Sequence, residues 1–417
     1  MTDLHELLQH AAPVPPEFDR DALVRVVGGR KRRRQAIALA AVATAAVVAI
    51  GAVVVTRDDT KAPGVAVSPK TDATSTAPST PMVTTPNGYQ ALAAMPRFPE
   101  RAVRTVALPE LVDGYDTTID GNTLWARGCA GTRPGYSCVS RIDLGSGAVR
   151  TFPGQSTDPV VTRVTTGDGG VFVLSSAFDG SPYHVTRLDP KTGRHLWSVA
   201  VPGTSVQGDP KARLRFGAGA LWFSLGTHPV VEFSPSDGAV IATIAVPGYV
   251  ETIGSVDFAF GANDVWVVGG ESGTSVMRID PTTKRVEVVA DAGLGFSQSL
   301  AADGHFVWTT HHTTRQDLVR IDTADHNRAT IVSVPTYEVA AGDGQTWFLG
   351  YEPTGSTRDG ANHPGVVGRI DPESGRVIAV TELPVGALDD PTLIVHRGKA
   401  YVLDAATHSL TIVDPAA

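Results

Sequence analysis

A short segment that ends in an apolar residue and an aspartate or serine recurs through most of this chain. The copies are separated by about 42–49 residues, which is the length of one β-propeller blade. A chain built from such units cannot bury its apolar surface one unit at a time, so the units must stack against one another. The seven copies end at Ile142-Asp143, Leu188-Asp189, Phe233-Ser234, Ile279-Asp280, Ile321-Asp322, Ile370-Asp371 and Val413-Asp414.

A second marker keeps the same period, because each unit also places an aromatic residue shortly after a glycine-containing turn. Each unit therefore predicts a strand, a tight turn, an aromatic strand, a variable loop, a strand ending in Ile-Asp, a turn, and a strand ending in Pro. We expect the aromatic residues to fill the space between blades rather than to stack on a ligand. Within its unit, Trp308 stands one position later than the aromatic residues of the other units. The alternative is therefore that Trp308 points to the other face of its blade. The aromatic residues are Trp125, Phe172, Trp222, Trp266, Trp308, Trp347 and Tyr401.

The two ends of the repeat region indicate how the ring closes. The last copy stops at Asp414-Pro415, after only three strands, and residues 101–109 match the missing fourth strand as it occurs at 239–247. An N-terminal strand that completes the last blade would leave no open edge in the ring. The sequence thus predicts an all-β fold, a seven-bladed β-propeller of four-stranded blades, over residues 100–417.

The first 99 residues differ in composition from the repeats. Five consecutive basic residues at 30–34 precede an uncharged apolar stretch at 36–55, long enough for one helix to cross a bilayer. The positive-inside rule then predicts a cytoplasmic tail at 1–35, a single transmembrane helix at 36–55, and an extracytoplasmic propeller at the cell membrane. A cleaved signal peptide is the alternative, although the stretch is longer than a usual signal-peptide core.

Residues 56–99 are rich in Pro, Thr and Ser and poor in large apolar residues. Such a segment buries too little surface to offset the entropy of ordering it, so we expect a flexible stalk. In the tail, Leu4, Leu7, Leu8 and Ala11 follow helical spacing. That short helix could dock a cytoplasmic partner, or the tail could serve only to orient the transmembrane helix.

The two cysteines fit an extracytoplasmic domain. Cys129 and Cys138 are close in sequence, and the Gly and Pro residues between them allow the chain to turn back. Outside the cytoplasm, such a pair predicts a disulfide rather than two buried thiols.

These repeats resemble the bacterial propellers of the YVTN, virginiamycin-B-lyase-like and quinoprotein-like group over about residues 100–417. The unit from Arg187 to Trp197 is most similar to the quinoprotein repeat, in which Asp, Thr-Gly and Trp brace neighbouring blades. Only this unit carries the closing Trp, so the resemblance does not imply a quinone, and we expect no cofactor. The tail, helix and stalk also resemble those of actinobacterial membrane proteins that accompany regulators of envelope response.

No nucleophile elbow, zinc-binding helix, phosphate loop or EF-hand series occurs after residue 55, and the net charge of −8 argues against nucleic-acid binding. Loops on one face of a propeller usually carry its sites. The candidate ligand-binding residues are therefore the polar residues of the longest loops, although solvated loop tips are the plainer interpretation. Adjacent blades would bring some of them to one rim, which would suit an acidic ligand or a metal, but no complete metal motif is present. The candidates are His311, His312, Arg315, Arg358, His363 and Asp389.

Three functions remain compatible with the sequence. The first is a membrane-tethered, extracytoplasmic recognition or sensor module that binds a protein, a polysaccharide or a small ligand. The second is an extracytoplasmic lyase or hydrolase with a site on the loop face, so catalysis stays open although no catalytic residue can be named. The third is a transmembrane regulator whose tail contacts a cytoplasmic partner such as a sigma factor. We favour the first, because it explains the anchor and the stalk together with the missing catalytic motif.

Overall fold

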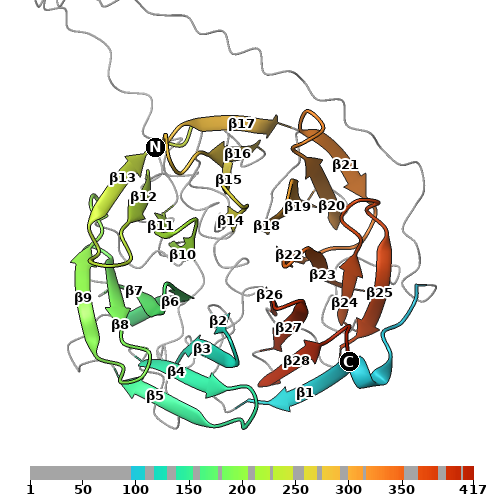
Figure 1. Cartoon of the computed structure of the whole chain (residues 1–417), viewed down its shortest axis with the longest axis horizontal. Helices are drawn as coiled ribbons and strands as arrows, with labels where there is room; N and C mark the ends of the chain where they lie inside the picture. The colour runs from blue at the N-terminus through green and yellow to red at the C-terminus, as the bar shows by residue number, and fades with distance from the viewer. Residues whose placement is uncertain are drawn as a thin grey trace, which may run out of the picture. The chain divides into compact units, whose positions relative to one another are not determined.

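The computed structural model contains seven four-stranded antiparallel sheets, which surround a central axis as the blades of a propeller (Figure 1). Each sheet is a meander in which neighbouring strands in sequence are hydrogen-bonded neighbours in space. The predicted fold class, blade number and strand number are confirmed. The structure describes residues 95–108, 117–128, 138–153, 160–176, 181–204, 212–225, 229–247, 258–269, 275–291, 299–312, 316–351, 365–383, 391–404 and 407–417.

In each of the first three blades, the shortest connection is the tight turn between the first and second strands. Blade 1 comprises β2 (Thr117–Asp120), β3 (Thr123–Arg127), β4 (Cys138–Asp143) and β5 (Val149–Pro153). Blade 2 comprises β6 (Val160–Gly167), β7 (Gly170–Ser176), β8 (His184–Leu188) and β9 (His195–Ala200). Blade 3 comprises β10 (Arg213–Gly217), β11 (Ala220–Ser224), β12 (Val230–Phe233) and β13 (Val240–Ile244).

The next three blades repeat this order, with the first strand nearest the axis and the fourth at the rim (Figure 1). Blade 4 comprises β14 (Ala259–Phe260), β15 (Val265–Gly269), β16 (Ser275–Ile279) and β17 (Val286–Asp291). Blade 5 comprises β18 (Leu300–Asp303), β19 (Phe306–His312), β20 (Gln316–Asp322) and β21 (Arg328–Val332). Blade 6 comprises β22 (Glu338–Gly342), β23 (Gln345–Tyr351), β24 (Gly365–Ile370) and β25 (Val377–Glu382).

Blade 7 joins the two ends of the propeller. Its first three strands come from the C-terminal end, as β26 (Thr392–His396), β27 (Lys399–Asp404) and β28 (Ser409–Val413). Its outer strand is β1 (Val103–Ala107), which pairs antiparallel with β28 from Val103 opposite Val413 to Ala107 opposite Ser409. The predicted closure by the N-terminal strand is therefore confirmed, because the open edge of β28 receives a partner from about three hundred residues away.

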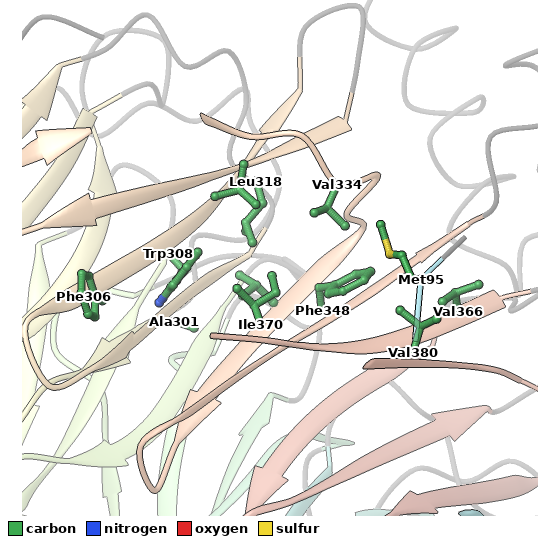
Figure 2. Close-up of a cluster of buried hydrophobic side chains, with 12 residues drawn as sticks. Met95, Ala301, Phe306, Trp308, Leu318, Val334, Phe348, Val366, Ile370 and Val380 are labelled. Carbon is green, nitrogen blue, oxygen red and sulfur yellow. The ribbon is translucent and has the colours of Figure 1, made fainter. Parts of the chain in front are cut away.

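The core lies between the blades rather than inside any one of them. Within the described residues, a cluster of buried apolar side chains occupies each boundary between adjacent blades. Figure 2 shows the boundary between blades 5 and 6, where Phe306, Trp308 and Leu318 face Phe348 and Ile370. Each sheet is apolar on both faces and is covered on both, as the repeat pattern predicts.

The seven aromatic residues that mark the repeat all face the following blade, and this includes Trp308. Trp308 lies opposite Arg320, just as Trp266 lies opposite Arg278 in the preceding blade. The alternative that Trp308 points to the other face is therefore wrong. The reason is the turn before it: Gly304, with φ +59°, comes first in the two-residue turn, whereas in blade 3 Gly219 comes second. Trp308 therefore stands one position later when it is counted from the glycine of the turn, although the register of its strand is unchanged.

Polar contacts across several blade boundaries tie one blade to the turn between the third and fourth strands of the next. Arg187 of blade 2 donates from Nη1 to the carbonyl oxygen of Pro235 at 2.9 Å, and Trp197 Nε1 donates to the same oxygen at 3.3 Å. Arg320 of blade 5 donates to Pro372 of blade 6 at 2.9 Å. The bracing role that the quinoprotein resemblance implies for Trp197 is therefore present in the structure.

These third-to-fourth-strand turns are closed by the aspartates of the repeat. Asp143 Oδ1 accepts hydrogen bonds from the backbone N–H of Ser146 at 2.7 Å and from the Ser146 hydroxyl at 2.8 Å. These bonds, the backbone one first, lower the pKa of Asp143 below its ordinary value. The backbone N–H of Thr192, followed by its hydroxyl, lowers the pKa of Asp189 in the same way. The pKa of Asp280 is lowered first by the Thr283 backbone, and that of Asp371 by the Ser374 backbone.

The propeller should therefore lose stability in acid. A carboxyl group whose pKa is lower in the folded than in the unfolded chain stabilises the fold above the unfolded pKa, and this contribution disappears as the pH falls through the folded pKa. We expect the free energy of unfolding, measured by denaturant titration, to fall below about pH 4. The double variant Asp143→Asn/Asp189→Asn should be less stable at pH 7 and show a shallower acid dependence. An unchanged free energy of unfolding between pH 5 and pH 3 would contradict this assignment.

The residues just before β1 form an ordered strap along the edge of blade 6. Arg97 makes a parallel bridge with Val380 of β25, through bonds from Phe98 N to Val380 O at 3.0 Å and from Val380 N to Pro96 O at 2.9 Å. Phe98 stacks on Trp347 with ring centroids 5.5 Å apart, and Met95 is buried with 6% exposed. A short 3₁₀ turn, η2 (Glu100–Ala102), then leads into β1. The strap thus lies within the segment predicted as stalk, in the five residues before the predicted start of the propeller.

The remaining predictions for the N-terminal region lie outside the described residues. These are the tail at 1–35, the apolar stretch at 36–55 and the stalk up to residue 94. In the described part of the chain, no helix has both the length and the apolar character needed to cross a membrane.

Only one of the two cysteines is described, so the disulfide stays a prediction. Cys138 is buried at the start of β4, and its carbonyl oxygen accepts a bond from the N–H of Gly128, the residue before Cys129, at 3.1 Å. We expect thiol labelling of the unfolded, unreduced protein to find no free sulfhydryl. Reduction should lower the free energy of unfolding by about 2.5–3 kcal/mol, the value for so short a loop. The Cys138→Ser variant, which must expose one thiol, calibrates the labelling, and two labels on the wild-type chain would exclude the bond.

Candidate functional site

The strand order divides the propeller into two faces with different connections. First strands begin, and second strands end, at the same face, because neighbouring strands in each blade are antiparallel. The connections between blades and those between second and third strands therefore share one face, which we call the loop face. The tight turns between first and second strands and those between third and fourth strands share the other, the turn face. Of the predicted ligand-binding residues, His311 and His312 end a second strand and so lie at the loop face.

The structure positions only part of the predicted group. His311 and His312 end β19, where their backbones pair with Asp317 and Gln316 of β20. Arg315, Arg358, His363 and Asp389 lie outside the described residues. Whether these side chains meet on one rim therefore stays a prediction.

The base of the loop face is formed by the first residues of the inner strands, and side chains there link blade 5 to blade 6 and blade 6 to blade 7. Ser299, just before β18, donates from Oγ to Val339 O at 3.0 Å and accepts from Val339 N at 3.1 Å. Glu338 of β22 accepts from Leu393 N of blade 7 at 3.0 Å. A side chain of one blade thus makes hydrogen bonds to backbone groups on the inner strand of its neighbour. These bonds fix the strand ends from which the loops leave.

In blades 2 and 3, two arginines occupy the position that Glu338 occupies in blade 6. The sequence analysis did not single them out. Arg163 of β6 and Arg213 of β10 each lie four residues before the end of the inner strand, as Glu338 does in β22. Both are buried, with 6% and 7% exposed. Arg163 Nη1 donates to Thr162 O at 2.6 Å. The signal that could have found them is the shared spacing from Arg to the glycine that ends each inner strand, Gly167 and Gly217.

On the turn face, His396 has a displaced pKa in addition to the aspartates of the repeat. Burial, followed by the charge of Arg397, lowers the pKa of His396 at the end of β26, against the opposing effect of Asp343 and Asp120. Asp343 accepts from the N–H of Gly398 at 3.1 Å, which links the turns of blades 6 and 7. This arrangement joins the last two blades of the ring.

Metal ligation has no support in the part of the chain that the structure describes, where no group of three or more His, Cys, Asp or Glu side chains converges. The described residues provide the strand ends from which the connections of the loop face leave.

Comparison with known proteins gives one family match and several similar folds. A family model described as outer membrane protein assembly factor BamB matches residues 118–331, just over half of the chain. This span runs from the inner strand of blade 1 to the outer strand of blade 5. The comparison with curated proteins gave no match.

Among solved structures, the propeller is similar to U3-55K, with a TM-score of 0.55 and 9% identity over 76% of this chain and 99% of that one. A chain of the mitotic checkpoint complex gives a TM-score of 0.52 and 12% identity over 75% and 93%. The RRP9 WD40 repeats give a TM-score of 0.55 and 8% identity over 77% and 99%. At these identities the likenesses show the propeller fold alone.

Proposed function

Because this chain belongs to the family described as outer membrane protein assembly factor BamB, we propose that its propeller is a protein-binding scaffold that uses the loop face. The observation that carries this proposal is the locked base of that face. Ser299 and Glu338 each bridge to the inner strand of the following blade, so the loops leave from strand ends that are held in place. A rigid base reduces the conformational entropy that a binding surface loses when its partner docks.

The proposal includes a position at the membrane. The basic run at 30–34 and the apolar stretch at 36–55 support an anchor whose N-terminal side is cytoplasmic. The propeller would then act outside the cytoplasm, tethered through the segment before Met95. His311, His312, Arg315, Arg358, His363 and Asp389 are the residues that we propose contact the partner.

Site-specific photo-crosslinking in intact cells tests both parts of this function. A photoreactive amino acid at position 311 or 363 should give a discrete protein adduct, and protease added outside the cells should remove it. The triple variant His311→Ala/Arg315→Ala/His363→Ala, probed from position 312, should lose the adduct. Its thermal stability should change little, because we predict these residues to be surface loop residues, and surface substitutions contribute little to folding.

The turn face provides the matched control. The same photoreactive amino acid at Asn327, in the turn between β20 and β21, should give no such adduct. If positions 311 and 363 give no adduct, or if position 327 gives the same one, the loop face is not the binding surface. An adduct that resists external protease would contradict the extracytoplasmic position and leave the binding surface itself intact.

A further inference from the structure

The joint between blades 7 and 1 holds a histidine at its turn-face end, where β26 and β2 lie side by side near the axis (Figure 1). His396 ends β26, two residues after Ile394, which packs against the buried cluster between these blades. Alternate residues of a strand share one face of the sheet, so the side chain of His396 also faces blade 1. Its imidazole is hydrogen-bonded to the backbone of Gly121, in the turn between β2 and β3. His396 therefore bridges the inner turns of blades 7 and 1.

The hydrogen bonding of the imidazole favours its neutral form. Its Nε2 atom is buried and has no hydrogen-bond partner among the described residues. A proton added to this nitrogen would create a buried, charged N–H group without an acceptor. Burial of an unpaired charged donor costs more free energy than burial of an unpaired neutral acceptor. The closed joint therefore holds the neutral imidazole better than the imidazolium.

The charged groups around His396 come from three turns and from the neighbouring strand β27. Arg397 follows it in its own turn, Asp120 belongs to the turn of blade 1, and Asp343 belongs to the turn of blade 6. Lys399 lies directly opposite His396 on β27 and forms an ion pair of its own. Burial, followed by the charge of Arg397, exceeds the effect of the two aspartates and lowers the pKa of His396. The electrostatic surroundings thus act in the same direction as the hydrogen bonding.

We propose that His396 is a pH-sensitive latch, which holds the inner turn of blade 7 against that of blade 1 at neutral pH and releases it in mild acid. In the open joint the imidazole is in water, where it takes up a proton near pH 6.5. A histidine whose pKa is lower in the closed than in the open joint stabilises the closed joint above the open-state pKa. This contribution is lost as the pH falls through the closed-state pKa. The sensitive range therefore lies below about pH 6.5.

The latch acts on one side of blade 7 only. The same turn is tied to blade 6 through Asp343, which accepts a hydrogen bond from the N–H of Gly398 at 3.1 Å. That bond does not involve the imidazole, so protonation of His396 leaves it in place. Mild acid should therefore loosen the joint between blades 7 and 1 while the joint between blades 6 and 7 stays closed.

Hydrogen–deuterium exchange of the full chain in detergent, at about pH 7 and about pH 5.5, tests the latch. Each exchange rate is compared with that of the unfolded chain at the same pH, which removes the intrinsic pH dependence of exchange. The protection of residues 117–127, in β2 and β3, should fall at least about threefold between the two pH values. Residues 213–224 of blade 3 should keep their protection, because they lie far from this joint around the ring (Figure 1).

Two variants identify the titrating group. His396→Gln removes the group that titrates, so it should abolish the fall in protection. Arg397→Asn removes the like charge beside the imidazole, which raises the pKa of His396 and should make the fall smaller. Asparagine tolerates the φ of +51° at this position. His305→Gln is the matched control, since His305 is a turn-face histidine of blade 5, and it should leave the fall unchanged.

Equal protection of residues 117–127 at the two pH values in the wild-type chain overturns the latch. So does a fall that persists in His396→Gln, because the titrating group then lies elsewhere. A fall of equal size in residues 213–224 also overturns it, since the acid effect is then global. Arg397→Asn must change the fall by itself, so the test does not depend on whether His396→Gln folds.

Discussion

Deletion of residues 101–108 is expected to leave the propeller unfolded or aggregated. The deletion removes β1, exposes the edge of β28, and uncovers Leu410 and Ile412 in the cluster between blades 7 and 1. Leu108 is itself buried in that cluster, and its N–H donates to His408 O at 2.7 Å. Burial of a leucine contributes about 2 kcal/mol and each backbone bond about 1 kcal/mol. The expected loss is on the order of 5 kcal/mol or more, a large part of the stability of a typical domain.

Thermal unfolding followed by circular dichroism measures this effect. Deletion of residues 1–94 keeps the strap and β1, so it is the control and should melt close to the full chain. A propeller without residues 101–108 that melts within a few degrees of this control would show that β1 does not close the ring.

Replacement of Lys284 by Met is expected to cost about 3 kcal/mol or more of folding free energy. Lys284, in the turn between β16 and β17, pairs with Glu232 of blade 3 and lies 5.8 Å from the centre of the Trp222 ring. Only 5% of the Glu232 side chain is exposed. Loss of the lysine leaves a buried carboxylate without its cation, which typically costs 3–5 kcal/mol.

A double-variant cycle separates the ion pair from simple packing. Glu232→Leu combined with Lys284→Met should recover most of the stability, because a buried ion pair can be replaced by apolar groups at little cost. Urea denaturation of the single and double variants supplies the free energies. If Lys284→Met alone changes the free energy of unfolding by less than about 1 kcal/mol, the pair behaves as an exposed surface contact.

The propeller itself could be predicted from the sequence because its constraints repeat. Every unit places an aromatic residue in its second strand and Ile-Asp, or an equivalent pair, at the end of its third, and these positions fix register, burial and turns together. The strap could not be predicted in this way. Met95 to Pro99 carries two prolines and no repeat signal, and its partner Val380 lies far along the chain. Its composition therefore assigned the strap to the stalk, because a contact between residues so far apart in the sequence leaves no local sequence pattern.

The candidate site was less predictable, because loop sequences follow no period. Polar residues near His311 stood out only because their loops exceed what a blade requires. Arg163 and Arg213 were missed because each belongs to a strand that otherwise reads as ordinary core, and their equivalence emerges only when inner strands are aligned by their ends.

The strap gives the propeller a defined mechanical order of failure. Tension applied through the residues before Met95 reaches the parallel bridge between Arg97 and Val380 and the Arg97–Glu382 ion pair before it can load β1. The stack of Phe98 on Trp347 must also be broken first. A pulling force therefore acts first on the contacts of the strap with blade 6. The pairing of β1 with β28, which closes the ring, carries the load only after the strap has detached. Single-molecule traces should show a small early extension before the ring ruptures.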